Sequence, residues 1–321
     1  MKEFSGKLAV VTGGGSGIGR ELAVQLAAAG CNVAACDIFS DSLAETAALC
    51  SEAVRVTTHE CDVADEAQVL AFRDEVVEQH EAECIHLLFN NAGIGSPVGF
   101  IDGDREEWER VFGVCWYGVY YCARAFMPLL VASDEAYLVN TSSINGFWAS
   151  LGPTVPHTPY SAAKFAVKGF SEALIADLRV HAPHVKVAVV MPGHVGTSIG
   201  FNSSRVLGAP EPENLSRDQV AAIRKQMVIS GLPVGNESDD HIRRAVAQRR
   251  VDFRDNAPTT AARAASIILD GVRQDRWRIL VGEDAHILDE LVREDPEAAY
   301  ELEFIGRILQ RGALGGLTNQ P

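Results

Sequence analysis

The chain lacks several features that would point to particular classes of protein. It contains no CxxC pair, and its seven cysteines are scattered and odd in number. This pattern fits buried free thiols in a reducing compartment better than a disulfide framework, and it predicts no metal site. Positive charge is in deficit, with a net charge of −15 at pH 7. That balance argues against non-specific binding to nucleic acid or to an anionic membrane.

Targeting and membrane signals are also missing. Residues 1–7 lead directly into a strand-like run without a signal-peptide pattern, and no apolar run looks long enough to span a bilayer. No internal repeat or low-complexity segment is present. The 321 residues are 47% hydrophobic and 22% charged, which is typical of a soluble globular protein. We therefore expect a cytoplasmic protein with neither a membrane nor a nucleic acid as partner.

Short apolar runs alternate with amphipathic stretches through most of the chain. Parallel strands covered on both faces read as continuous apolar runs, so the pattern predicts an α/β fold with a doubly wound parallel seven-stranded sheet and helices on both faces. Ligands of such sheets bind beyond the carboxyl ends of the strands. The expected strands are 8–11, 32–36, 54–60, 85–89, 136–140, 185–190 and 277–281.

A glycine-rich segment, Thr12–Gly19, joins the first strand to a helix that stops at Gly30. Glycines in this context let the backbone approach a pyrophosphate, whose charge the N–H groups and the helix dipole then hold. The order strand, turn, helix favours a dinucleotide site over a plain glycine-rich turn.

Acidic and amide side chains follow the next strands. Asp37 ends the second strand, where a carboxylate can bind the adenosine ribose hydroxyls and repel a 2′-phosphate. Ser16 adds no positive charge, so NAD is favoured over NADP, although Asp37 could merely begin the following turn. Asp62 could bind the adenine amino group or cap the helix that starts near Asp65. The paired amides of Asn90-Asn91-Ala92-Gly93 can tie neighbouring loops together, and the glycine leaves room for a ribose.

Tyr160 and Lys164 are four residues apart near the start of a helix expected over 159–181, with Thr158 as its N-cap. Side chains at this spacing share one helix face. An ammonium beside a phenol lowers the phenol pKa, and a tyrosine so tuned can accept a proton from an alcohol. Hydroxyls at Ser142 and Ser143, after the fifth strand, would face Tyr160 across the site.

Taken in order, these motifs resemble those of the short-chain dehydrogenase/reductase family over residues 6–197 and 258–282. The resemblance implies a Rossmann fold and a nicotinamide-dependent oxidation of an alcohol or reduction of a carbonyl. It implies Ser143, Tyr160 and Lys164 as catalytic residues. The cofactor residues it implies are Gly13, Ser16, Gly17, Ile18, Asp37, Asp62, Val63, Asn91, Gly93, Tyr160, Lys164, Pro192, Gly193, Val195 and Thr197.

One position departs from the family pattern. Cys115 stands where the family usually carries an asparagine that is thought to anchor a water in the proton relay from the lysine. A thiol is a weak donor and acceptor. The relay could use other groups or a backbone carbonyl, the activity could be reduced or specialised, or the protein could bind NAD and do little chemistry. We favour the first alternative.

Three segments are open to two interpretations. The apolar helix expected over 104–131 could face a second subunit or be covered by the C-terminal tail. Apolar residues of the lid insertion 198–257 and of Phe147-Trp148 suggest a bulky apolar substrate or simply pack the lid, and the arginine run 243–250 reads as a solvated face. We expect residues 1–282 to form one domain with this lid, and 283–321 to form a helical extension with frayed last residues from Gly312, covering the site or a neighbouring subunit.

The sequence thus favours an NAD-dependent alcohol dehydrogenase or ketone reductase that acts on a small molecule as a homodimer or homotetramer. The alternatives are an NAD-binding regulatory protein with vestigial catalysis, and a dehalogenating or epimerising enzyme on the same fold. The Ser143–Tyr160–Lys164 set opposes both.

Overall fold

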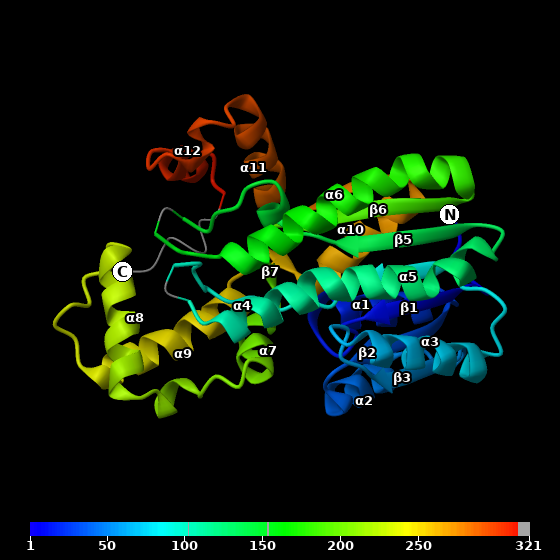
Figure 1. Cartoon of the computed structure of the whole chain (residues 1–321), viewed down its shortest axis with the longest axis horizontal. Helices are drawn as coiled ribbons and strands as arrows, with labels where there is room; N and C mark the ends of the chain where they lie inside the picture. Colours follow the sequence, from blue (N-terminus) through cyan, green and yellow to red (C-terminus); the bar gives the residue numbers. More distant parts are fainter. Residues whose placement is uncertain (102, 153, 314–321) are drawn as a thin grey trace.

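The fold is built around a seven-stranded parallel sheet with the strand order β3-β2-β1-β4-β5-β6-β9 (Figure 1). The computed structural model describes residues 1–101, 103–152 and 154–313. The predicted fold class is confirmed, and all seven expected strands are present with shifted ends. They are β1 (Leu8–Thr12), β2 (Asn32–Asp37), β3 (Val56–Glu60), β4 (Leu87–Asn90), β5 (Ala136–Thr141), β6 (Val185–Pro192) and β9 (Arg278–Val281).

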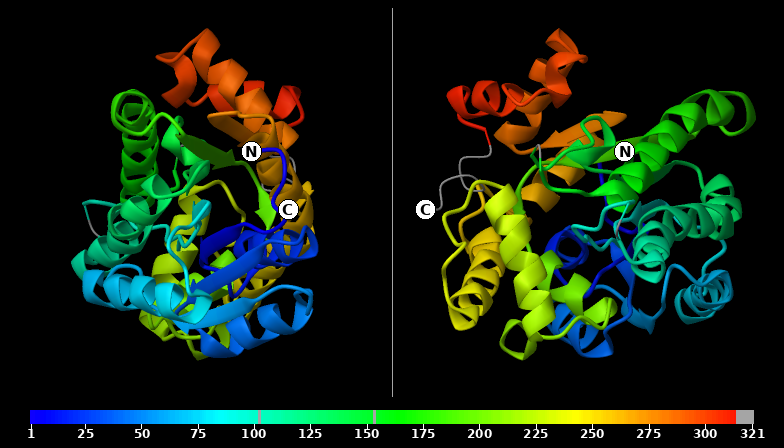
Figure 2. Two further views of the ribbon diagram at one scale, coloured as in Figure 1. Left: turned by 90° about the vertical axis from the view of Figure 1, so that its right-hand side faces the viewer. Right: turned by 60° about the vertical axis from the view of Figure 1, so that its left-hand side comes forward.

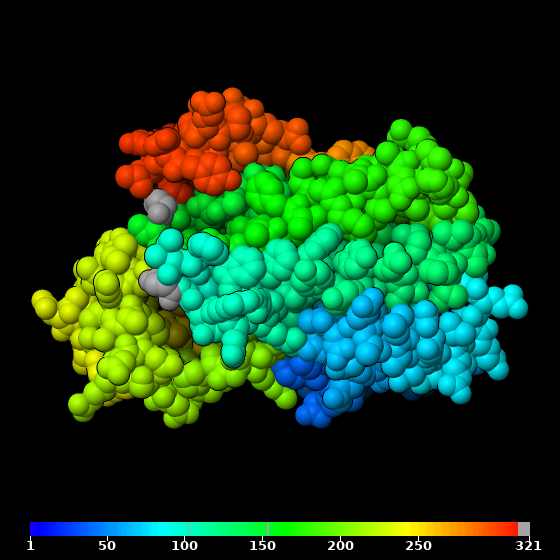
Figure 3. Space-filling model, viewed as in Figure 1, coloured from blue at the N-terminus to red at the C-terminus, as the bar shows by residue number. Residues whose placement is uncertain are grey.

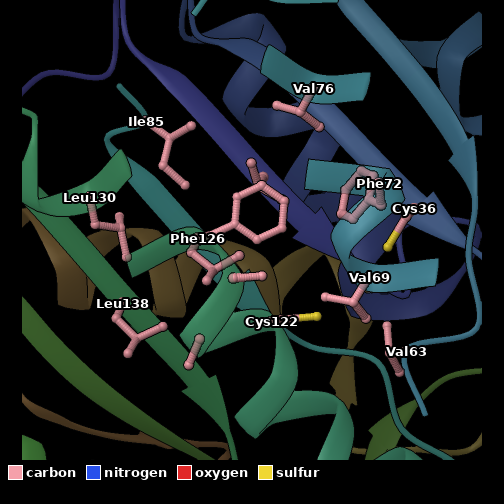
Figure 4. Packing of buried hydrophobic residues seen from close by; sticks show 14 of the residues in the cluster. Cys36, Val63, Val69, Phe72, Val76, Ile85, Cys122, Phe126, Leu130 and Leu138 are labelled. Carbon is pink, nitrogen blue, oxygen red and sulfur yellow. The ribbon is translucent and has the colours of Figure 1, made fainter. Parts of the chain in front are cut away.

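Helices cover both faces of the sheet (Figures 1 and 2). One face carries α1 (Gly17–Ala28), α2 (Ser40–Leu49) and α10 (Ala261–Arg273), which pack through residues such as Leu22, Leu43 and Ile268. The other carries α3 (Glu66–His80), α5 (Gly118–Val131) and α6 (Thr158–His181). Figure 4 shows Phe72 of α3 and Phe126 of α5 meeting over the strands, in an edge-on contact of 5.4 Å between ring centroids. Each face of the sheet therefore has its own apolar core.

The expected helix over 104–131 is interrupted by a π-helical turn. It runs as α4 (Arg105–Phe112), η1 (Gly113–Tyr117) and α5, and the turn includes Cys115. Contrary to expectation, the stretch Arg105–Val131 is long and apolar enough to cross a membrane by length and composition. Half of its most apolar window is buried inside the protein, as in a core helix.

The lid insertion folds into helices of its own. α7 (Ile199–Val206) was not expected, whereas α8 (Arg217–Ile229) and α9 (Asp239–Asp255) were, including the N-cap at Ser238. α8 and α9 enclose a small separate core around Val220, Met227 and Ile242. A two-stranded parallel sheet, β7 (Val195–Gly196) with β8 (Thr259–Thr260), ties the two ends of the insertion together.

The C-terminal extension forms α11 (Glu283–Glu294), the short turn η4 (Ala298–Tyr300) and α12 (Phe304–Gln310). Up to residue 313, the extension packs on β9 and on the loop around Trp148, and this described part does not form the expected cover of the helix 105–131. Ala313 is buried there, so fraying does not begin at Gly312 as expected. The rest of the expected frayed segment, 314–321, lies outside the described residues. Figure 3 shows the tail (orange to red) and the lid (yellow-green) as separate lobes on the same side of the molecule.

Candidate functional site

The glycine-rich segment forms a cradle at the carboxyl end of β1. Gly13 and Gly17 have positive φ angles of 66° and 53°, which favour glycine. A Cβ on Gly13 would lie 2.8 Å from the Cα of Ala92, so the loop needs glycine to pass beside the segment that follows β4. No side chain caps the first turn of α1 in the part of the chain that the structure describes, and that turn carries no acid. Its N–H groups suit the pyrophosphate of a dinucleotide.

Asp37 ends β2 and is held beside this cradle. Its carboxylate accepts hydrogen bonds from the N–H groups of Gly15 (3.0 Å) and Phe39 (3.1 Å). Burial raises the pKa of Asp37, and these backbone bonds lower it in part. The carboxylate therefore lies at the edge of the cleft where an adenosine ribose would be expected.

Asp62 is not a helix cap, which removes one of the two alternatives for it. The cap of α3 is Asp65, whose side chain accepts from the N–H groups of Ala67 and Gln68. Asp62 instead accepts from the N–H of Ala64 and forms an ion pair of 2.7 Å with Arg110 of α4. Both members of this pair line the cleft.

The paired asparagines tie neighbouring strand ends together, as predicted. The amide nitrogen of Asn90 donates to the amide oxygen of Asn140 at 2.8 Å, which joins β4 to β5. The amide of Asn91 donates to the carbonyl of Thr12 at 3.2 Å, which joins β4 to the glycine cradle. Gly93 follows, and a Cβ there would lie 3.5 Å from the Nζ of Lys164.

Ser143, Tyr160 and Lys164 converge on the same cleft. Ser143 follows the end of β5 at Thr141, its Oγ accepts from the N–H of Asn145 at 3.1 Å, and hydrogen bonding from this hydroxyl lowers the pKa of Tyr160. The Nζ of Lys164 lies 5.4 Å from the centre of the Tyr160 ring and donates to the carbonyl of Thr141 at 2.8 Å. The hydroxyl of Ser142 instead donates to the backbone carbonyl of Lys164, away from the phenol.

The expected lowering of the Tyr160 pKa is not found, and this is a correction. Burial raises the pKa of Tyr160 above its ordinary value, the nearby Cys115 raises it further, and the hydrogen bond with Ser143 lowers it. Burial also lowers the pKa of Lys164. Low dielectric disfavours the charged form of both groups.

A second correction concerns Thr158. It is the first helical residue of α6, and His157 holds the N-cap position.

Cys115 is fully buried next to the Tyr160–Lys164 pair. Its thiol donates to the backbone carbonyl of Ile94 at 3.1 Å. A Cβ on Gly93 would lie 3.5 Å from Lys164 Nζ and 3.8 Å from Cys115 Sγ, so both side chains end beside this glycine. The thiol therefore lies near the lysine but uses its one donor on a carbonyl.

The segment 192–197 closes the other side of the cleft. Pro192, Gly193, Val195 and Thr197 all line it, and a Cβ on Gly17 would meet the methyl of Thr197 at 3.1 Å. The structure therefore brings every predicted site residue to one cleft, from Gly13 to Thr197.

Other lining residues were missed. Arg110 lies in α4 beside several other charged side chains, so nothing in the sequence distinguishes it from a solvated residue. Asn202 of α7, whose amide donates to the Ser16 hydroxyl at 2.9 Å, and Phe253 of α9 lie in the lid, where no motif marks them.

The comparisons with known proteins agree with this geometry. A family model described as short chain dehydrogenase matches residues 7–205. The chain belongs to the short-chain dehydrogenase family. A putative oxidoreductase SadH of Mycobacterium tuberculosis is 32% identical to this short-chain dehydrogenase over 294 residues, which are 91% of this chain and 92% of that protein.

Two further relatives are informative. The human epidermal retinol dehydrogenase 2 is 32% identical over 72% of this chain and 75% of its own length. The crystal structure of a short-chain dehydrogenase/reductase from Burkholderia phymatum in complex with NAD has a TM-score of 0.72 and 31% identity, and the match covers 92% of this chain and 96% of that one. This short-chain dehydrogenase is therefore an NAD(P)-dependent oxidoreductase, and its glycine cradle fits the cofactor of the family.

Proposed function

We propose that the protein oxidises secondary alcohols to ketones with NAD and catalyses the reverse reduction, on bulky apolar substrates. The observation that carries the proposal is the convergence of Ser143, Tyr160 and Lys164 on the cleft that also contains the glycine cradle. A proton acceptor and a dinucleotide site in one cleft are what a hydride transfer from an alcohol requires.

In this proposal Tyr160 is the acid and base. For oxidation its phenolate would take the proton of the substrate hydroxyl, and the hydride of the substrate C–H bond would pass to the cofactor. The alcohol would thereby lose two electrons and two hydrogens. Bound NAD⁺ supplies the hydride acceptor and a positive charge that favours the phenolate. Ser143 would orient the substrate oxygen, and Lys164 would bind the nicotinamide ribose.

Further cofactor contacts follow from the positions of the lining residues. The first turn of α1 at Gly17 and Ile18 would hold the pyrophosphate, and Asp62 with Val63 would hold the adenine. Val195 and Thr197 would receive the nicotinamide carboxamide. These assignments are proposals that single substitutions with NADH titration can test.

The preference for NAD rests on Asp37. A half-buried carboxylate at the ribose end of the cleft would repel a 2′-phosphate, because two negative groups would lie close together there. We expect Asp37→Ala to weaken NAD⁺ binding and to reduce the discrimination against NADP⁺. Titration of both cofactors by calorimetry measures this, and equal affinities in the unsubstituted protein would contradict the proposal.

Most of the apolar residues that suggested a bulky apolar substrate instead pack within the protein. Met227 and Leu232 belong to the core of the lid, and Trp148 and Phe147 pack against the tail. The substrate class now rests on the cleft itself, which is lined by Ile94, Ile199, Val206 and Phe253. The similarity to a protein named retinol dehydrogenase points the same way.

The test of the proposal is a scan of secondary alcohols of increasing size, with a retinoid alcohol included, in the presence of NAD⁺. NADH formation is followed by absorbance, and Tyr160→Phe is the control because it removes only the hydroxyl. General acid–base catalysis contributes about 10²- to 10⁴-fold, so we expect a loss of that order in the variant. Turnover no greater than in Tyr160→Phe, despite tight NADH binding, would instead support the regulatory NAD-binding protein.

We also propose that the protein acts as a homodimer or homotetramer in the cytoplasm. Aromatic side chains of η1, α5 and α6 contact one another at the edge of the core beneath the long helix, namely Trp116, Tyr117, Tyr120, Tyr121 and Phe170. Tyr117 is 44% exposed. An aromatic patch of this kind is typical of a subunit interface. Sedimentation analysis of the unsubstituted protein and of Tyr117→Asp would test it.

A further inference from the structure

Asp284 is a buried carboxylate at the start of the C-terminal extension, where no motif predicted a site. It lies in the first turn of α11, directly after β9, and is only 4% exposed. Its Oδ2 accepts a hydrogen bond of 2.6 Å from the backbone N–H of His194. A buried charge of this kind is costly unless it is hydrogen-bonded, so this contact fixes both groups. His194 belongs to the segment 192–197 that lines the cleft.

Two glycines are shaped around this carboxylate. A Cβ on Gly193 would lie 2.3 Å from both oxygens of Asp284, and a Cβ on Gly282 would lie 2.4 Å from its Oδ1. Side chains cannot approach so closely, so both positions require glycine while Asp284 is in place. Gly193 lines the cleft and Gly282 forms the turn before α11. The glycines at 193 and 282 thus leave room for Asp284 to contact the cleft segment.

The same peptide is held from the lid. The Nε2 of His194 donates to the backbone carbonyl of Phe253 at 2.7 Å, and the two rings lie 4.4 Å apart. Val195 pairs with Thr259 in the small sheet β7–β8. His194 therefore holds segment 192–197 from two sides. Its backbone N–H binds the extension, and its side chain binds the end of α9.

This arrangement retains polar atoms that are not satisfied. The Nδ1 of His194 and the Oδ1 of Asp284 are buried without a hydrogen-bond partner among the described residues. Such groups cost stability, so the close contacts of this carboxylate are kept at a cost to the fold.

We propose that Asp284 is a positioning residue of the cofactor site, which holds the Gly193–His194 peptide so that segment 192–197 can receive the nicotinamide carboxamide. The inference rests on the proposed function and assigns the C-terminal extension a part in it. Asp284 acts through the peptide and does not contact the reacting atoms.

The test compares NADH with ADP-ribose, which has the adenosine, the pyrophosphate and a ribose but no nicotinamide. Both are titrated by calorimetry into the full-length protein and into Asp284→Ala, Asp284→Asn and Asp289→Asn. Asp289 is a matched control, because it is also buried on α11 but pairs with Arg278 and Arg293. Loss of a hydrogen bond to a charged group predicts NADH binding about tenfold or more weaker in Asp284→Ala.

We expect ADP-ribose affinity to change little in every variant, and Asp289→Asn to bind NADH like the unsubstituted protein. Asp284→Asn keeps an oxygen that can accept from His194, so it should lose less than Asp284→Ala, and it serves as the test if the alanine variant does not fold. Equal weakening of NADH and ADP-ribose, or NADH binding unchanged in both Asp284 variants, would overturn the inference. Failure of the unsubstituted protein to bind NADH would overturn the proposed function itself.

Discussion

At the scale of single residues, the environment of Tyr160 opposes its ionisation. Burial raises its pKa, and within the protein the lowering influence is the hydrogen bond with Ser143. Lys164 is itself buried and makes its hydrogen bond to the Thr141 carbonyl. The reactive state of the phenol therefore depends on the serine as well as on the bound cofactor.

This dependence gives a pH prediction for Ser143→Ala. Oxidation needs the phenolate, so the rate falls as the pH falls below the pKa of Tyr160. Removing the hydrogen bond that stabilises the phenolate raises that pKa further, so the pH profile of kcat/KM for oxidation should move to higher pH. Profiles of both proteins with one alcohol measure the shift. A profile that falls in amplitude without moving would contradict a role of Ser143 in tuning the phenol.

Cys115 gives a second prediction at this scale. Its thiol donates to the Ile94 carbonyl, so it is poorly placed to carry protons from Lys164. If the relay uses other groups, Cys115→Ala should keep the turnover number within about threefold, since a thiol is a weak donor and acceptor. Steady-state kinetics with saturating NAD⁺ is the measurement. A hundredfold loss with unchanged NADH affinity would show that the thiol belongs to the relay.

Most of the site residues that the sequence predicts follow the ends of strands, whereas the missed ones are placed by tertiary packing. Asp37 and Asn91 follow strands directly, so the topology alone brings them to the cleft. Asp284 also follows a strand, but its partner is a backbone N–H, and a peptide group leaves no signature in the sequence. Arg110 meets Asp62 only because α4 packs beside the loop that follows β3, a packing detail that helical periodicity does not specify.

At the scale of elements, the helix over 105–131 shows the same limit. Its apolar periodicity predicts a buried helix, but it does not predict the π turn Gly113–Tyr117, which shifts the helical register of the side chains that follow it. π turns are frequent at functional sites and have no strong propensity signal. The two parallel strands β7 and β8 have two residues each, too few for any alternation to be recognised.

The contact between the tail and the loop after β5 can be tested at Trp148. The side chain is buried against Phe304, and its Nε1 donates to the Ala299 carbonyl at 2.8 Å. Trp148→Ala should lower the free energy of unfolding by about 3–5 kcal/mol, as for other large aromatic truncations. Trp148→Phe keeps much of the packing and should lose about 1–2 kcal/mol with the hydrogen bond.

Urea unfolding followed by circular dichroism measures both variants. The losses in free energy of unfolding of the two variants should differ by the contribution of side-chain packing. Equal small losses would mean that the tail is not packed on the loop in solution.

At the scale of the whole molecule, half-buried histidines link stability to pH. The pKa of His80 is lowered to about 4, chiefly by burial and then by Arg55 and His59. Between pH 4 and the ordinary pKa of about 6.5, the unfolded chain binds this proton and the folded one does not. The contribution of His80 to the free energy of unfolding is therefore fully present above pH 6.5, and it is lost as the pH falls from about 6.5 to about 4. His157, with a pKa of about 4, acts in the same direction.

We expect His80→Asn to lose less stability than the unsubstituted protein on going from pH 7 to pH 4.5. Asp37 and Asp284, whose pKa values burial raises, act in the opposite direction, so the difference between the two proteins is the informative quantity. Denaturant titrations at several pH values measure it. Parallel stability curves for the two proteins would contradict the assigned burial of His80.

The separate core of the lid has a consequence for how the protein responds to heat. Val220, Met227 and Ile242 form a cluster far smaller than the two cores on the sheet, and free energies of local opening follow the amount of buried apolar contact. The lid should therefore come off the cleft at temperatures where the sheet is still intact. Inactivation on warming would then be reversible and would precede calorimetric melting, and a bound substrate that holds the lid down would delay it.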